Sequence, residues 1–156
     1  MELRCQQAEL DQALHLVSRA VARRSTLPIL SNVLLDATEG ALRITATNLE
    51  IALSVSLPAE VQEAGQLSVR ADVFTDFVGS LPRQDVLLSA PSGTTDLRVT
   101  CGTSKARIPG IPAEDFPTIA RIGDQPPTAI VDAEALRDAV SQVVFAAATD
   151  DSRPVL

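Results

Sequence analysis

The sequence contains no tryptophan and no tyrosine, and its four phenylalanines fall mostly on apolar helix or connector segments. Proteins that bind single-stranded nucleic acids stack bases on aromatic side chains, and this chain offers no such platform. Histidine is equally scarce, because His15 stands alone and has no ligand-type residue one helical turn further on. Cys5 and Cys101 form no CxxC pair and lie inward in alternating patterns, which favours buried, reduced thiols.

Long apolar runs and phosphate-binding glycine motifs are also missing. No stretch approaches the ~20 apolar residues of a membrane span, and the opening residues MELRCQQ lack a signal-peptide core. We therefore expect a cytoplasmic protein with no membrane partner. Neither GxGxxG nor a P-loop occurs, and we expect no cofactor and no metal. The adjacent carboxylates Glu114-Asp115 and Asp150-Asp151 are typical of turns, although the second pair leaves a metal-dependent hydrolase as a weak hypothesis.

What the sequence does contain is a two-faced helix, predicted from Gln7 toward Arg24. An apolar stripe recurs along it at helical spacing, formed by Leu10, Leu14, Val17 and Val21. The opposite side carries the cationic or titratable residues His15, Arg19, Arg23 and Arg24. Arginines in a last helical turn also complement the helix dipole, so this feature alone has a purely structural interpretation.

The charge distribution favours a DNA interface over a general surface effect. The whole chain has a net charge of −7, whereas residues 1–24 hold four arginines against three carboxylates, a net +1, which leaves −8 for the remainder. An acidic body repels duplex DNA everywhere except along its cationic strip. Arginine contacts to phosphate are independent of base sequence and weaken with salt.

The first helix recurs in the second half of the chain. At a shift of 126 positions, which takes Leu10 to Leu136, the segment Ala133 to Leu156 matches in register through helix, loop and strand start. We interpret this as a domain-sized internal repeat. Asp132 is the expected N-cap of a helix over Ala133 to Ala147, which should bury Leu136, Val140, Val143 and Ala147. The chain then ends as its second unit begins, so we expect a part of a longer protein.

In residues 1 to 108, the predicted order of elements is one strand, one helix and three strands, and this order occurs twice. The predicted strands include Met1 to Cys5, Ile29 to Asp36, Ala41 to Thr47, Gln66 to Val69 and Ser104 to Ile108, with a second helix over Ala71 to Ser80 that packs Val73, Phe74, Phe77 and Val78. Pro58 to Gly65 is a predicted loop, and Pro109 to Pro127 a connector. Eight strands and two helices favour an α+β fold with two four-stranded antiparallel sheets and both helices on one side.

With the helix and its arginine tail, TLPILSNVLL, the hairpin strands, IPAEDFP and DDSRPVL in this order, the sequence resembles the N-terminal part of bacterial DNA sliding clamps, the beta subunit of the replicative polymerase. The resemblance implies a first clamp domain over 1–120, and a linker with an incomplete second domain over 121–156. It also implies a non-catalytic processivity factor. Two protomers of that family close head to tail into a ring around double-stranded DNA, and polymerase, clamp loader and repair proteins dock on it through a short peptide motif.

The resemblance also assigns residues. Arg24 stands where the family carries a DNA-contacting arginine, and Arg19, Arg23 and Arg137 are further DNA candidates inferred from the helix face. Arg153 and Leu156 match the start of the family's partner cleft. Ala106 and Ile108 lie at the expected protomer interface.

Three features depart from the family pattern. The second helix offers Asp72 and Asp76 where the family is often basic, Ala106 is small, and Asp150-Asp151 adds negative charge near the hole. These departures predict a ring that either holds DNA more loosely than its relatives or relies on residues beyond Leu156. The alternative function is a two-sheet protein-interaction module whose basic strip is only surface.

Overall fold

A computed structural model describes residues 1–22, 26–119 and 129–147. The chain divides into two compact units, Met1–Ile119 and Ala120–Leu156.

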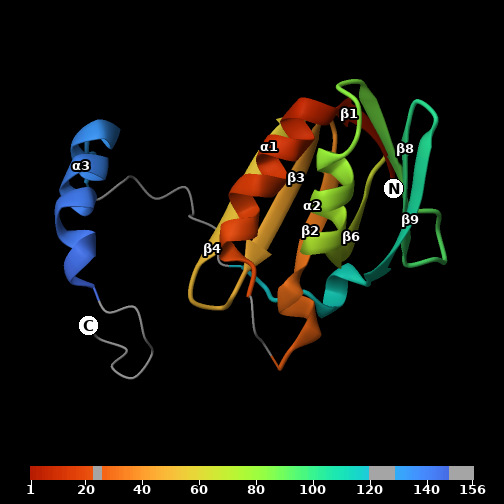
Figure 1. The fold of residues 1–156 in the computed structure, drawn as a ribbon. Coiled ribbons are helices and arrows are strands. Elements are labelled where there is room, and N and C mark those ends of the chain that lie inside the picture. Colours follow the sequence, from red (N-terminus) through yellow and green to blue (C-terminus); the bar gives the residue numbers. More distant parts are fainter. Residues whose placement is uncertain (23–25, 120–128, 148–156) are drawn as a thin grey trace. The chain divides into compact units, whose positions relative to one another are not determined.

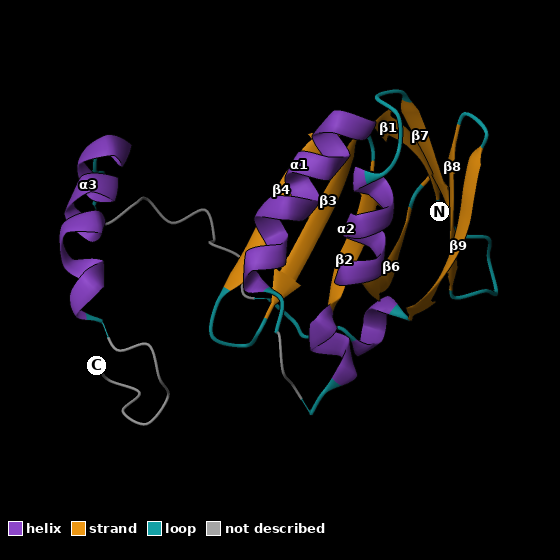
Figure 2. Cartoon of the chain, in the orientation of Figure 1, coloured by secondary structure: helices purple, strands orange, loops and turns teal. Residues whose placement is uncertain are grey.

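The first unit is built on one antiparallel sheet (Figure 2). Its strands are β1 (Glu2–Gln6), β2 (Asn32–Thr38), β3 (Ala41–Thr47), β4 (Ala52–Pro58), β5 (Glu60–Glu63), β6 (Gly65–Arg70), β7 (Asp85–Ser89), β8 (Asp96–Cys101) and β9 (Ser104–Ile111). Their spatial order is β4-β3-β2-β6-β9-β8-β7-β1-β5. The α+β fold class expected from the sequence is confirmed.

Two details of the sheet differ from the expected pair of four-stranded sheets. The long strand β9 pairs along most of its length with β8, and its last residues pair with β6, at Ser68 with Ile111 and Val69 with Gly110. The two halves therefore join into one nine-stranded order. The ninth strand, β5, lies in the segment predicted as a loop and pairs with β1, at Leu3 with Val61.

Two helices cover one face of the β4-β3-β2-β6 half, α1 (Gln7–Val17) and α2 (Ala71–Gly79) (Figure 1). The core lies between these helices and the sheet. It includes the fully buried side chains Leu10, Leu14, Val17, Leu35, Ile44, Val69 and Phe74. The apolar stripe predicted on the first helix is therefore confirmed as its core face, with Val21 packed at the margin. Cys5 and Cys101 are buried free thiols, as expected.

The first helix ends earlier than its periodicity predicts. After Val17 the backbone tightens into a short 3-10 turn, η1 (Ser18–Ala20), and Val21 is already extended. A second 3-10 turn, η2 (Pro28–Ser31), occupies the start of the predicted strand Ile29 to Asp36. Proline at the first position of a helical turn fixes the required φ and has no N–H to leave unpaired, so the strand begins only at Asn32.

Val73 on α2 was predicted to pack inward and is instead 48% exposed, whereas Phe74 and Val78 are buried. The helix is short and its core stripe runs through Ala71, Phe74 and Val78, which leaves the neighbouring position on the outer side.

In the second unit, the described elements are α3 (Ala133–Val143) and the turn η4 (Val144–Ala146) that continues it. Asp132 caps α3 as predicted, because its Oδ1 accepts a hydrogen bond from the Ala135 amide at 2.9 Å. The apolar side chains expected in a core are exposed, with Leu136 at 52% and Val143 at 65%. Among the described residues of this unit, no other helix or strand packs against the apolar face of α3.

Candidate nucleic-acid interface

The layer formed by α1 and α2 is the candidate interface, because these helices cover one face of the sheet (Figure 1) and His15 and Arg19 of the predicted cationic face are exposed on α1 and on the turn that follows it. The exposed residues of α1 and η1 on this layer include Gln12, His15, Leu16 and Arg19. Asp72, Val73 and Asp76 are exposed on α2.

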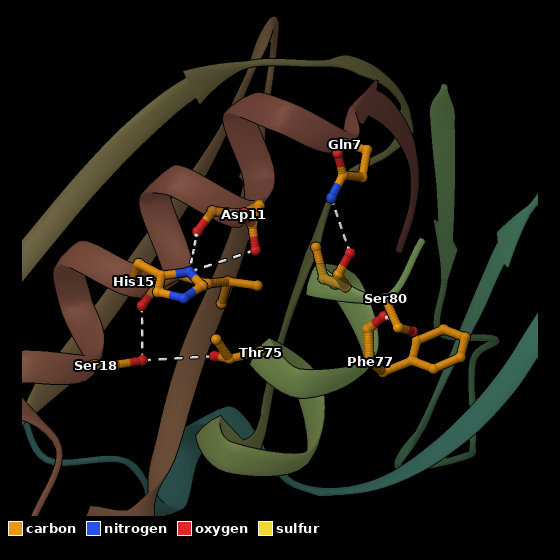
Figure 3. A network of polar contacts seen from close by, with 9 residues as sticks. Gln7, Asp11, His15, Ser18, Thr75, Phe77 and Ser80 are labelled. Carbon is orange, nitrogen blue, oxygen red and sulfur yellow. Dashed lines mark hydrogen bonds and ion pairs between the residues drawn. The ribbon is translucent and has the colours of Figure 1, made fainter. Parts of the chain in front are cut away.

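Polar contacts fix the two helices side by side (Figure 3). At one end, buried Gln7 of α1 donates its side-chain amide to the Val78 carbonyl of α2 at 2.9 Å. At the other end, the Ser18 hydroxyl donates to the Leu14 carbonyl at 2.7 Å and lies 3.5 Å from the Thr75 hydroxyl. The start of α1 is therefore next to the end of α2, so the helices run antiparallel.

Two of the basic side chains on or beside this layer, His15 and Arg70, have a carboxylate partner. The His15 ring nitrogen Nδ1 lies 2.9 Å from the Asp11 carbonyl and 3.4 Å from the Asp11 carboxylate, so the imidazole is held along its own helix (Figure 3). Arg70, the last residue of β6, forms an ion pair with Asp72 in the first turn of α2. Arg19 is exposed and forms no ion pair with any residue that the structure describes.

A surface pocket of about 400 Å³ lies where the end of α1 meets the start of α2. One wall is formed by Ser18, Val21 and Ala22, and the other by Arg70, Asp72 and Asp76. Ala22 is the last described residue before positions 23–25. The Arg70–Asp72 pair is thus a neighbour of the segment that leads into the predicted basic loop.

The predicted site residues fall into three groups. Arg23, Arg24, Arg153 and Leu156, together with Asp150 and Asp151, lie outside the described residues. Arg19 lies on the helical layer. Arg137 lies on α3 in the second unit, where its exposed guanidinium is 3.4 Å from the adjacent Asp138 carboxylate.

Ala106 and Ile108 lie on β9, opposite Val99 and Leu97 of β8. Both face the side of the sheet that carries the core, and Ile108 is only 3% exposed because it packs inside the unit. In the pairings described, Ser104 to Ile108 bond to β8 on one side, whereas pairing with β6 begins at Gly110.

The described residues contain no group of three or more histidine, cysteine, aspartate or glutamate side chains placed to hold a metal ion. None of the helices in the described ranges is long and apolar enough to cross a bilayer.

Comparison with known proteins identifies the fold. Residues 1–120 match the model of the DNA polymerase III beta subunit, N-terminal domain. The chain belongs to the DNA polymerase III beta subunit family. Within it, the chain is 37% identical to the beta sliding clamp of Synechocystis sp. and 32% identical to that of Streptomyces coelicolor, each over the full chain.

Solved structures of this family agree with the sequence matches. The DNA polymerase sliding clamp of Caulobacter crescentus aligns with a TM-score of 0.89 at 34% identity over 98% of this chain. A sliding clamp of Bartonella birtlesii bound to griselimycin aligns with a TM-score of 0.85 at 28% identity. The chain spans 41% of the length of the Synechocystis relative and 41% of the Caulobacter chain.

The Arg70–Asp72 pair was not predicted from the sequence. These residues are two positions apart across the junction of a strand and a helix, where neither period two nor period 3.6 places side chains together. The usable signal was an arginine at the end of a strand followed by an aspartate in the first turn of a helix, where a carboxylate is favoured.

Proposed function

We propose that this chain is the N-terminal part of a non-catalytic sliding clamp, which encircles duplex DNA without sequence specificity and tethers the replicative DNA polymerase. The observation that carries the proposal is the fold match, at a TM-score of 0.89, to a DNA polymerase sliding clamp over 98% of the chain. In this proposal, residues 1–120 are the first clamp domain, and residues 121–156 are a linker and the beginning of a second one.

The charge and geometry of the helical layer support this proposal. An encircling protein needs only weak, non-specific contacts, because topology keeps the DNA bound while the ring slides. Arg19 on α1 is an exposed cation suited to phosphate, and Arg24, Arg23 and Arg137 are the further DNA-contacting residues of the proposal. The acidic remainder of the chain disfavours binding on other faces.

The test is retention on DNA of different topology. Full-length protein is loaded by its clamp loader onto nicked circular DNA, and retention is followed by gel filtration before and after the circle is cut. We expect retention on the circle at high salt and release after linearisation. Equal retention on circular and linear DNA contradicts encirclement.

Substitution of Arg24 separates the clamp from the alternative, a two-sheet protein-interaction module. Arg24→Ala should reduce loading or DNA retention if the basic strip is a DNA site. Unchanged DNA behaviour together with loss of a protein partner supports the module. If Asp150→Asn abolished a metal-dependent activity, the hydrolase hypothesis would replace both.

The proposed partners follow the same hypothesis. Polymerase, clamp loader and repair proteins dock a short peptide motif in a cleft that begins at Arg153 and Leu156. Self-association into a head-to-tail homodimer uses β9 near Ala106 and Ile108, where Ser104 to Arg107 pair with β8 on one side in the described residues. The protein works in the cytoplasm, where chromosome replication takes place.

A further inference from the structure

Arg70 and Asp72 form a two-pronged ion pair at the junction of β6 and α2. The Arg70 Nε donates to Asp72 Oδ1 at 3.0 Å, and Nη2 donates to Oδ2. Asp72 Oδ1 also accepts the Val73 amide at 2.8 Å, which places the carboxylate firmly in the first helical turn. The hydrogen bonds from Arg70 hold the pKa of the Asp72 carboxyl below its usual value, so it stays charged.

This pair lies at the end of the helical layer where Ser18, Val21 and Ala22 follow α1. Asp72 and Asp76 line the same pocket as Ser18 and Ala22 at the end of α1. The pocket therefore joins the second helix to the chain segment that precedes positions 23–25. The pair is exposed, with more than half of each side chain accessible to solvent.

A guanidinium binds phosphate through the same two-pronged geometry that it uses with a carboxylate. While Asp72 occupies the Nε–Nη2 edge of the Arg70 guanidinium, that edge is closed to a phosphate, and the pair as a whole carries no net charge. Asp76, one helical turn beyond Asp72, adds an exposed negative charge to the same face. The start of α2 is consequently neutral to acidic, although Arg70 directly precedes it.

We propose that Asp72 restrains Arg70 and so weakens the hold of this domain on the DNA backbone. By pairing with Arg70, Asp72 keeps this cation from contacting the phosphates and so lowers the affinity of the domain for duplex DNA, which favours sliding. This inference rests on the proposed function, because it assumes that duplex DNA passes along the layer formed by α1 and α2.

The test is Asp72→Asn in the full-length protein, with equilibrium binding to a short linear duplex measured across a salt series. Asparagine keeps a side-chain oxygen for the Val73 amide, so the start of the helix is preserved. Each phosphate contact contributes about 0.9 to the slope of log affinity against log salt. We expect the slope to steepen by about 1 and the affinity at low salt to rise roughly three- to tenfold, as one freed arginine contact predicts.

Two further variants identify the cause of any gain. Glu39→Gln makes the same change in charge at a distant site. Arg70 pairs with Asn32 at the start of β2, whereas Glu39 lies in the turn that follows the end of β2. It should leave affinity and slope unchanged. The double variant Asp72→Asn with Arg70→Gln should return to the wild-type slope or below it.

An unchanged slope for Asp72→Asn, or a gain that persists in the double variant, overturns the inference. Wild-type retention on circular DNA, measured in parallel, separates this failure from a failure of the proposed function. If retention depends on topology while Asp72→Asn has no effect, the clamp assignment stands and the proposed role of Asp72 is wrong. If wild type shows no such dependence, the premise fails as well.

Discussion

Gly110 lies where β9 leaves β8 and joins β6, and we predict that Gly110→Ala strongly destabilises the first unit. A Cβ added at this position lies 2.5 Å from the Ser68 carbonyl oxygen and 2.7 Å from the Thr95 carbonyl oxygen. Close C···O contacts in sheets are about 3.3 Å, so the methyl group overlaps each oxygen by more than half an ångström. Both obstacles are backbone atoms and cannot turn away.

The cost has two parts. Overpacking a tightly packed site costs about 1–3 kcal/mol. Displacing the chain also weakens the hydrogen bond from the Gly110 amide to the Thr95 carbonyl, 2.7 Å long, which contributes about 1 kcal/mol. We therefore expect a loss of about 3 kcal/mol in the free energy of unfolding, or a fall in Tm on the order of 10 °C.

Urea unfolding followed by circular dichroism measures this difference, with Gly79→Ala as the matched control. The Cβ at Gly79, at the end of α2, meets only Asp11 Oδ1 at 3.5 Å, an ordinary contact. Replacing a helical glycine by alanine gains up to about 1 kcal/mol, so the control should be neutral or more stable. If Gly110→Ala unfolds within about 0.5 kcal/mol of wild type, β9 is not confined between these two carbonyls.

Three further predictions concern stability. Burial, with smaller contributions from two nearby carboxylates, raises the pKa of Cys5 from 9.0 to about 12, so folding favours the neutral thiol. The contribution of the neutral thiol to the free energy of unfolding is complete below pH 9 and is lost as pH rises toward 12. Between pH 8 and pH 10, urea unfolding should show a decrease of about 1 kcal/mol in the free energy of unfolding. Cys5→Ala should abolish this decrease. Phe74→Ala should cost about 3–5 kcal/mol in the same assay, whereas exposed Val73→Ala should change stability by less than about 0.5 kcal/mol, and equal effects would refute the assigned helix face. Asp132→Ala should remove about 1 kcal/mol from α3, seen as faster amide exchange at Ala135, while Asp132→Asn should retain most of the protection.

The alternating strands and the apolar face of α1 were predictable, because burial on one side imposes a period that the sequence displays. Few other groups titrate in the alkaline range used to test Cys5, since the chain has no tyrosine and one lysine, Lys105. Such features depend on local pattern, and the fold class followed from their order along the chain.

The misses had different physical origins. β5 is a polar edge strand with the sequence EVQE, and only Val61 packs against the core, so its alternation was too weak to detect. The run after Pro28 is apolar enough for a strand, but the proline starts a 3-10 turn. The sequence correctly predicted the helix α3 and its apolar face. It also predicted that this face is buried, but burial depends on another element packing against the helix, which the spacing of apolar residues does not reveal.

The candidate site was predicted only in outline. Helical spacing placed Arg19 on the outer side of the first helix, because a period of 3.6 fixes which residues share a face. It could not reveal that Arg70 is neutralised by Asp72, since that pairing depends on how a strand turns into a helix.

The junction between β6 and β9 has a mechanical consequence. This is the narrowest connection in the sheet, with paired positions at Ser68 and Ile111 and at Val69 and Gly110, reinforced by the Ser68 hydroxyl, which donates to the Ile111 carbonyl at 2.9 Å. Tension applied across the strands, from β4 toward β5, concentrates on these few bonds before it reaches the longer ladders on either side. We expect the sheet to bend first along that line, while the longer ladders on either side keep their hydrogen bonds.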